Sequence, residues 1–186
     1  MTAQTASSHL ARMEDAGLLA RRRQGRHRYV ALASGDVARM LEAMMGLAAA
    51  AGHRRVRPGP REPALREARI CYDHLAGEQA VAMLDALRRE GAVVEDGGGL
   101  ELTDPGAQMF ERFGLDLATL RRARRPLCRA CLDWSERRHH LGGALGAAVL
   151  GLVRDRGWAR REEGSRAVRF TRGGMARFRD AFGIRG

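Results

Sequence analysis

The chain has 186 residues, of which 45% are apolar, 30% charged and 5% aromatic, and this globular composition excludes a disordered or fibrous protein. The formal net charge is +11 and every one of the 33 basic residues is arginine, a surplus that favours partners carrying phosphate. No apolar run reaches the roughly 20 residues that cross a membrane, the N-terminus has no signal-peptide pattern, and three irregularly spaced cysteines form no disulfide framework, so we expect a cytoplasmic protein.

The first predicted element is a helix that ends at Asp15, ahead of Gly17. A strand is expected over residues 18–23, a tip at residues 24–25 and a returning strand over residues 27–32. Helical spacing predicts that Ala6, Leu10 and Met13 face a core. The other faces then carry side chains suited to contacts with DNA bases and phosphates: Gln4, Thr5, Ser7, Ser8 and Arg12.

Positive charge is concentrated in this first segment. Residues 1–60 hold ten arginines and four acidic residues, whereas residues 61–127 hold ten and twelve. Arg26 and Arg28 at the hairpin tip, with Arg21 to Arg23 on the opposing strand, form a compact patch that suits a sugar-phosphate backbone or a minor groove. A solvated, charged hairpin with no partner is the structural alternative.

A second helix is predicted from Ser34, which caps it, to about residue 51. Its apolar side chains share one face, which needs a partner: Val37, Met40, Leu41, Met44, Leu47 and Ala48. Residues 52–63 have no apolar periodicity and are rich in Gly, His, Arg and Pro, so they are predicted to form a linker. The predicted domains are therefore residues 1–51 and residues 64–186.

An internal duplication fills the rest of the chain. Residues 75–91 align without a gap on residues 141–157, and residues 100–106 align on residues 168–174. Each copy predicts an amphipathic helix, a glycine that ends it, a hairpin and a threonine that caps the next helix, which gives repeats over about 75–116 and 141–184. A helix beside a hairpin is the second half of a winged helix-turn-helix. The expected fold is α+β and mainly helical, with a partial winged helix-turn-helix followed by a duplicated winged-helix-like domain.

Residues 5–32, TASSHLARMEDAGLLARRRQGRHRYVAL, resemble the recognition helix and wing of the ArsR family of bacterial winged-helix repressors. The Ser-x-His-Leu core of the match is Ser7 to Leu10, and the wing turn is Gln24 to Arg26. The resemblance implies a homodimeric repressor of transcription that binds double-stranded DNA, with residues 36–51 as the dimerisation helix. The predicted DNA-contacting residues are Gln4, Thr5, Ser7, Ser8, His9, Arg12, Arg26 and Arg28.

The chain departs from the family pattern at its N-terminus. The family places a dimerisation helix and a positioning helix upstream of the recognition helix, whereas only Met1 to Gln4 precede it here. We therefore expect an N-terminally truncated member, and a fragment that is inactive in DNA binding is one alternative.

CYDHLAG at residues 71–77 and CLDWSERR at residues 131–138 resemble blocks of a longer subgroup with an extra C-terminal domain, which is expected to receive a signal.

Each C-terminal copy begins with a cysteine, an aspartate and one or two histidines, from Cys71 to His74 and from Cys131 to His140. If the two copies pack with approximate twofold symmetry, these side chains converge. Thiolates, imidazoles and carboxylates together suit a thiophilic divalent metal ion such as zinc or cadmium. The predicted sensor site consists of Cys71, His74, Cys131 and Asp133.

Two other interpretations of these residues stay open. Cys128 and Cys131 form a C-x-x-C pair, a spacing that also serves redox chemistry and predicts a thiol switch. In a purely structural role, Asp73 and Asp133 would cap the following helices, while Tyr72 and Trp134 would fill the core. The signal is therefore a metal ion, thiol oxidation or a small molecule.

An enzyme is not expected. Cys131 with His139 or His140 is the only candidate pair of nucleophile and base, and the sequence has no phosphate loop, dinucleotide fingerprint or serine elbow. The predicted function is a DNA-binding repressor, and the alternative is a non-specific RNA- or protein-binding module built from winged-helix units. Salt dependence and sequence dependence of binding distinguish the two.

Overall fold

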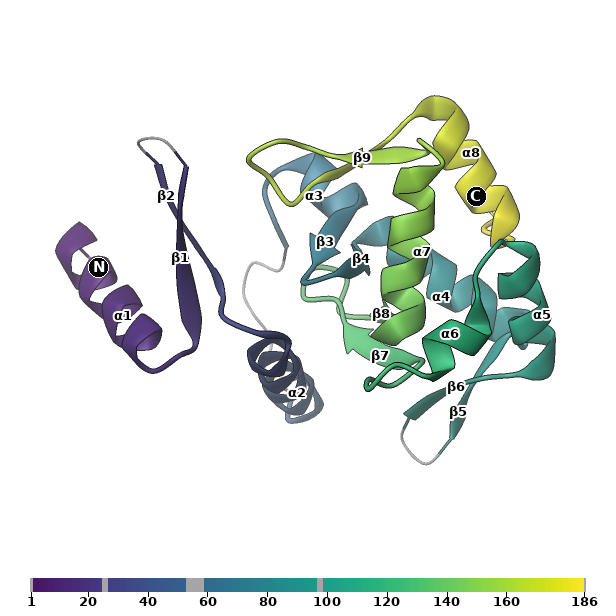
Figure 1. Ribbon diagram of the computed structural model, residues 1–186, viewed down its shortest axis with the longest axis horizontal. Coiled ribbons are helices and arrows are strands. Elements are labelled where there is room, and N and C mark those ends of the chain that lie inside the picture. The colour runs from purple at the N-terminus through teal and green to yellow at the C-terminus, as the bar shows by residue number, and fades with distance from the viewer. Residues whose placement is uncertain (1, 25–26, 53–58, 97–98, 186) are drawn as a thin grey trace. The chain divides into compact units, whose positions relative to one another are not determined.

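The computed structural model describes residues 2–24, 27–52, 59–96 and 99–185. Contacts divide the chain into two units, Met1–Arg54 and Arg55–Gly186, and the predicted linker spans this division. Both units consist of helices and short antiparallel hairpins (Figure 1), which is an α+β architecture. Among the helices of the described ranges, none combines the length and the hydropathy that a membrane span requires.

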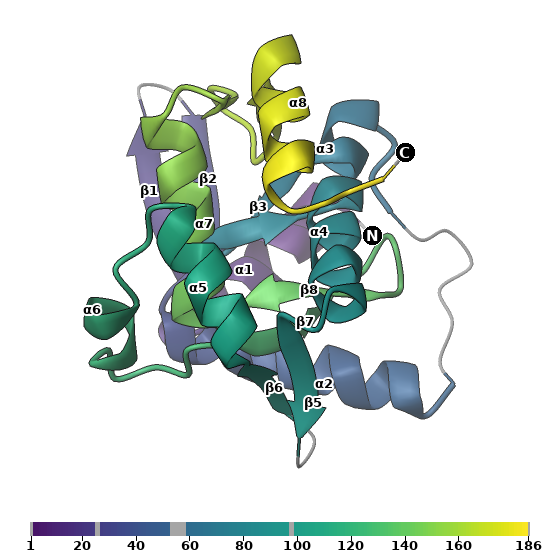
Figure 2. The ribbon, with the colours of Figure 1, turned by 90° about the vertical axis from the view of Figure 1, so that its right-hand side faces the viewer.

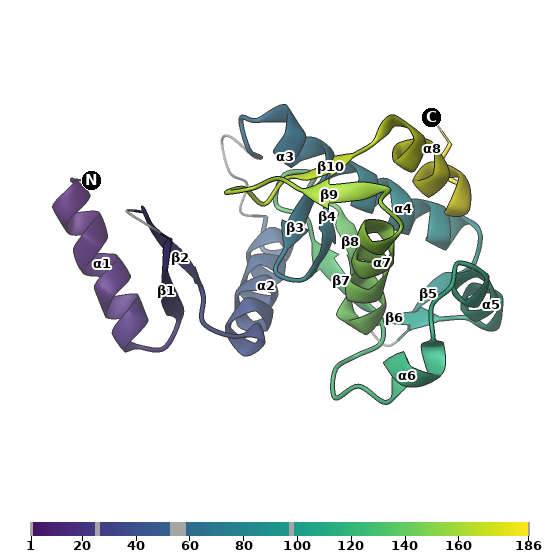
Figure 3. The same cartoon turned by 45° about the horizontal axis from the view of Figure 1, so that its top comes forward.

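Unit 1 is a helix beside a hairpin, followed by a second helix. Thr2 caps the first helix by accepting a hydrogen bond from the backbone N–H of Thr5, and Gly17 follows the helix with a φ of 71°. The Ser34 hydroxyl accepts a hydrogen bond from the backbone N–H of Val37, so the predicted cap of the second helix is confirmed. The first helix lies against the first strand (Figure 3). The elements are α1 (Ala3–Asp15), β1 (Leu19–Gln24), β2 (His27–Leu32) and α2 (Gly35–Ala50).

Unit 2 contains two copies of one order of elements, namely short helix, hairpin, helix, hairpin, helix. The first copy comprises α3 (Pro63–Glu67), β3 (Arg69–Cys71), β4 (His74–Ala76), α4 (Glu78–Arg89), β5 (Val93–Asp96), β6 (Gly99–Leu102) and α5 (Asp104–Arg112). The second copy comprises α6 (Leu117–Arg121), β7 (Arg129–Leu132), β8 (His139–Gly142), α7 (Gly143–Asp155), β9 (Ala159–Arg161), β10 (Val168–Phe170) and α8 (Arg172–Ala181). A hairpin, rather than a positioning helix, thus precedes α4 and α7.

The same local chemistry shapes both copies. Gly91 and Gly157 follow α4 and α7 with φ values of 67° and 66°, in the left-handed region where glycine carries no penalty. The hydroxyl of Thr103 accepts a hydrogen bond from the N–H of Gly106, and Thr171 does the same for Gly174. These matched signals are why the duplicated helices and hairpins could be predicted from the sequence.

The two copies of unit 2 pack in a crossed arrangement. Strand β4 contacts β8, and α7 of the second copy contacts β4 (Figure 3), while α4 of the first copy contacts β8 (Figure 2). The matching aromatic residues Phe110 and Phe178 are both fully buried, in one core that both copies share. The first hairpin of one copy is therefore held directly against the first hairpin of the other.

Candidate DNA interface and a cysteine and histidine cluster

The outer surface of α1 carries most of the side chains that were predicted to contact DNA. Six of them are exposed on this helix: Gln4, Thr5, Ser7, Ser8, His9 and Arg12. Arg28 lies in β2, where its backbone is in register with Arg23. Arg26 lies outside the described residues. Since α1 has no fully buried residue, its polar faces are available to a partner.

The predicted inner face of α1 is less buried than expected. Ala6 and Leu10 are half-buried, but Met13 is 37% exposed, so its assignment to the core was wrong. A two-stranded hairpin is too narrow to cover the whole apolar stripe of a helix. Arg21 on β1 pairs with Glu14 on α1 at 2.8 Å, which uses part of the predicted arginine patch to hold helix and hairpin together.

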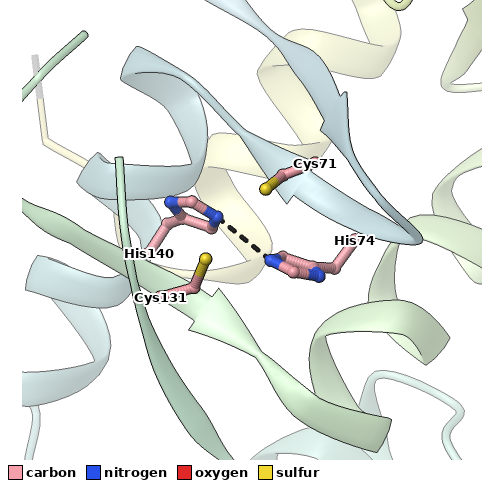
Figure 4. Close-up of side chains that lie close together, drawn as sticks. All are labelled: Cys71, His74, Cys131 and His140. Atoms are coloured by element: carbon pink, nitrogen blue, oxygen red, sulfur yellow. Dashed lines mark hydrogen bonds between the residues drawn. The ribbon is translucent and has the colours of Figure 1, made fainter. Parts of the chain in front are cut away.

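A second group of functional side chains lies where the first hairpins of the two copies meet in unit 2. Cys71 and His74 are direct partners across the β3–β4 hairpin, and Cys131 and His140 are direct partners across β7–β8. Side chains of such a pair lie on the same face of the hairpin. The two pairs face each other, and the four ligand atoms lie within 4.8 Å of one another (Figure 4).

Both imidazole rings turn the same nitrogen toward the centre of this cluster. The Nε2 atoms of His74 and His140 are 3.1 Å apart, and in Figure 4 the sulfur atoms of Cys71 and Cys131 lie on opposite sides of the line that joins them. Cys131 and both histidines are buried, whereas Cys71 is half-buried. The cluster thus gathers two thiols and two ring nitrogens in a nearly closed space.

The other ring nitrogen of each histidine faces a carboxylate. His74 Nδ1 lies 3.1 Å from Asp73 Oδ1, and His140 Nδ1 lies 3.5 Å from Asp133 Oδ2. Asp73 is itself paired with Arg125. For His74, the carboxylate of Asp73 behind Nδ1 favours the tautomer whose Nε2 carries the free lone pair, which is the arrangement that ligating histidines use, whereas Nδ1 of His140 makes no hydrogen bond.

Asp133 does not lie among the four clustered ligand atoms, in contrast to the prediction, and His140 takes its place. The carboxylate of Asp133 accepts hydrogen bonds from the guanidinium of Arg69 at 2.5 Å and from the backbone N–H of Gly77 at 2.7 Å. Ser135 donates to the same group through its N–H and its hydroxyl. The sequence contained the missed signal, because the gapless repeat places His140 directly before Leu141, as His74 stands directly before Leu75.

The structural roles predicted for neighbouring residues are only partly as expected. Asp133 bonds to the residue that caps α4, which belongs to the other copy, rather than capping the helix that follows it. Tyr72 does not fill the core: it is 50% exposed, at the turn between β3 and β4, with a φ of 57°. Trp134 packs against the guanidinium of Arg69, 5.0 Å from the ring centroid.

Electrostatics in the cluster favour a thiolate beside an imidazolium when no other cation is present. Hydrogen bonding to Cys131 is the main cause that lowers the pKa of Cys71, against the opposing effect of burial, and the two histidines lower it further. Burial lowers the pKa of His74, but hydrogen bonds to Asp73 and Cys71 outweigh it and raise the pKa to about 9. The site therefore stabilises the thiolate of Cys71 together with the positive charge of the His74 imidazolium beside it.

Cys128 stands apart from this group. It is buried, and burial together with the negative charge of Glu101 raises its pKa to about 11. Among the described residues, the group that could hold a metal ion contains Cys131 but not Cys128. The C-x-x-C spacing therefore does not correspond to a shared site here.

Comparison with known proteins identifies the class of this chain. It is 38% identical over 175 residues to an uncharacterized HTH-type transcriptional regulator, YdfF of Bacillus subtilis (strain 168), in an alignment that covers 94% of this chain and 77% of that protein. No family model and no solved structure matches the chain. Regulators of this type are not a family known to be enzymatic. The chain belongs to the helix-turn-helix transcriptional regulators.

Proposed function

We propose that the protein is an ArsR-like repressor that binds double-stranded DNA as a homodimer, and that unit 2 receives the signal that controls this binding. The observation that carries the proposal is the composition of the exposed surface of α1, which combines short hydroxyl and amide side chains with Arg12. Short polar side chains let a helix approach base edges closely, while arginine reaches guanine or phosphate. The arginine-rich β1–β2 hairpin follows this helix as a wing that would contact the backbone.

The helices at the matching positions of unit 2 are unsuited to reading DNA. In α4, six side chains are buried, including Met83, Leu84 and Leu87, and α7 is buried along most of its length. A helix that enters a major groove must expose its polar side chains to base edges. Within the described residues, α1 meets this requirement and α4 and α7 do not. This supports assigning DNA binding to unit 1 and signal reception to unit 2.

Dimerisation is assigned to α2. Its apolar side chains are exposed in the single chain: Met40 by 46%, Leu41 by 37%, Met44 by 59% and Leu47 by 73%. A contiguous apolar stripe of this kind on a helix indicates a protein interface. A second copy of α2 is the proposed occupant, since a twofold dimer would present two α1 helices to successive major grooves, about one helical turn apart.

Control by unit 2 requires a signal that binds differently to two states of the dimer. The coupling free energy equals the difference in signal affinity between the DNA-binding state and the released state. Unit 2 is included in the similarity to the regulator of B. subtilis, because 94% of the chain is aligned. It also holds the cluster of Cys71, His74, Cys131 and His140, whose chemistry suits the recognition of a signal.

The test is a DNA-binding measurement on the protein expressed from its own gene. Genomic fragments retained by the protein define the operator, and fluorescence anisotropy then compares operator with random duplex at physiological salt. We expect a preference for the operator of at least about 1,000-fold. Arg12→Ala should weaken operator binding by about 1–3 kcal/mol, whereas Arg112→Ala, the same change of charge at an exposed position of α5, should have little effect.

Three results would contradict this proposal. Equal affinity for operator and random DNA would indicate a non-specific nucleic-acid-binding module, and preference for RNA would indicate an RNA-binding one. An equal loss of affinity in the Arg12 and Arg112 variants would show that net charge, rather than the surface of α1, determines binding.

A further inference from the structure

We propose that Cys71, His74, Cys131 and His140 form a four-coordinate site for a thiophilic divalent metal ion of the zinc class, and that this ion is the ligand through which unit 2 acts. The regulatory part rests on the proposed function above. The metal site itself rests only on the geometry and chemistry of these four residues.

The spacing of the ligand atoms fits a tetrahedral ion. With zinc at about 2.0–2.1 Å from nitrogen and about 2.3 Å from sulfur, a tetrahedron requires separations of about 3.3 Å between two nitrogens and about 3.8 Å between two sulfurs. The two Nε2 atoms are 3.1 Å apart, and all four ligand atoms lie within 4.8 Å of one another. Small side-chain rotations therefore suffice to bring all four donors around one ion.

The surroundings of the ligands match those of an organised metal site. Asp73 lies 3.1 Å from Nδ1 of His74, which directs the Nε2 lone pair of that ring inward, and Asp133 lies 3.5 Å from Nδ1 of His140 without a hydrogen bond to it. The two carboxylates are fixed in turn by the guanidinium groups of Arg125 and Arg69.

The donor set selects the class of ion. Two thiolates and two imidazoles favour zinc and other thiophilic ions, whereas magnesium and calcium prefer oxygen ligands. Four protein ligands also complete a tetrahedral shell, and a catalytic zinc site would keep one position for water. The site is thus suited to holding an ion and not to activating a substrate, in agreement with a regulator.

The site lies between the two copies of unit 2, so a bound ion would connect them. Each copy contributes one cysteine and one histidine, so a bound ion links β3–β4 directly to β7–β8. Binding would stabilise one relative arrangement of the two copies, and its free energy would add to the stability of unit 2. Because Cys71 is only half-buried, the site is open to solvent on its side.

The experiment measures metal binding by the full chain without DNA. Purified protein is stripped with a chelator, reloaded with zinc or cobalt, and examined by elemental analysis and by absorbance. We expect one zinc per chain, and we expect cobalt to give thiolate charge-transfer bands together with the visible bands of a tetrahedral complex. Cys71→Ala and His140→Asn should lose the ion, whereas the matched controls Cys128→Ala and His139→Asn should retain it.

The outcomes separate the two proposals. Absence of a thiolate band in the wild-type cobalt protein overturns the site even if a variant fails to fold, and so does full metal retention in Cys71→Ala. Operator affinity is then compared with zinc and with chelator; a change of about 5–150-fold that is lost in His140→Asn supports regulation. An unchanged operator affinity overturns the regulatory role. Failure to bind any operator refutes the repressor, and the metal readouts still decide the site.

Discussion

The buried pair of Arg69 and Asp133 provides the sharpest test of how unit 2 is held together. Arg69 is 1% exposed and Asp133 is fully buried, and the carboxylate accepts hydrogen bonds from the guanidinium, from Ser135 and from the N–H of Gly77. Asp133→Asn keeps the shape of the side chain but removes its charge. The substitution therefore removes the negative charge that pairs with Arg69, and it also replaces one of the two acceptor oxygens with an N–H donor.

The expected loss can be worked out from the contacts that Arg69 keeps. Breaking a buried ion pair by removing one partner costs about 3–5 kcal/mol, because the remaining charge is left without compensation. Arg69 retains hydrogen bonds to the carbonyl of Leu65 at 2.9 Å and to the hydroxyl of Ser135 at 3.0 Å, and it stacks on Trp134. We therefore expect a loss near the lower end, about 3 kcal/mol.

Urea unfolding followed by tryptophan fluorescence measures this loss. Both tryptophans of the chain, Trp134 and Trp158, lie in unit 2, so the signal reports this unit alone, and a chelator removes any contribution from bound metal. With a slope of about 2 kcal/mol per molar urea, the midpoint should fall by about 1.5 M. Asp85→Asn, which breaks an exposed pair with Arg138, should cost less than about 1 kcal/mol. Equal losses in the two variants would refute the reasoning.

Three further predictions concern packing, thiol reactivity and the second layer of the metal site. In Gly174→Ala, the new Cβ would lie 2.0 Å from a backbone carbonyl oxygen, so urea unfolding should show that the free energy of unfolding falls by at least about 1–3 kcal/mol. The control Gly151→Ala has open space around it and should be neutral or stabilising by up to about 1 kcal/mol. A neutral Gly174 variant would contradict the packing. Burial holds the pKa of Cys128 at about 11, so at pH 8 mass spectrometry should find its thiol unmodified by iodoacetamide in the folded protein and modified in urea, with thiolate reactivity appearing only as the pH approaches that value; rapid modification of the folded protein would show the thiol to be accessible. Asp73→Asn should weaken zinc binding by about 10–100-fold in a chelator competition, and Asp85→Asn should not; identical affinities would remove the carboxylate from the metal site.

The parts of the fold that the sequence predicted well are those with local chemical signals. Thr103 and Thr171 cap helices and Gly91 and Gly157 follow helices because each acts through its own backbone, whatever packs around it. The first hairpins of unit 2 were missed because, unlike the second hairpins, they have no glycine at the turn and follow no helix-ending glycine, and the strands of all these hairpins are only three or four residues long. A strand of that length gives no readable alternation of apolar and polar residues.

The cluster was predicted in part, for a different reason. The convergence of Cys71 and Cys131 followed from duplication and the assumption of approximate symmetry. The predicted site contained Asp133 in place of His140, because strand register, which determines which side chains share a face, is not given by duplication or symmetry. His74 follows Cys71 after a two-residue turn, but eight residues separate Cys131 from His140, so equivalent positions in space differ in sequence spacing.

Duplication explains how such short hairpins can form a four-ligand site. One hairpin offers a single cross-strand pair of cysteine and histidine, which is too few donors for a closed zinc site. Crossed packing places the second pair opposite the first, because the helix of each copy contacts the hairpin of the other. Asp133 adds a further link across the boundary between copies, since its carboxylate accepts a hydrogen bond from the N–H of Gly77 at the start of α4 and lies 3.5 Å from the ring of His140. An ion bound at the centre would therefore respond to any shift of one copy against the other, and the same shift would alter its affinity, which is the property that a signal-receiving unit requires.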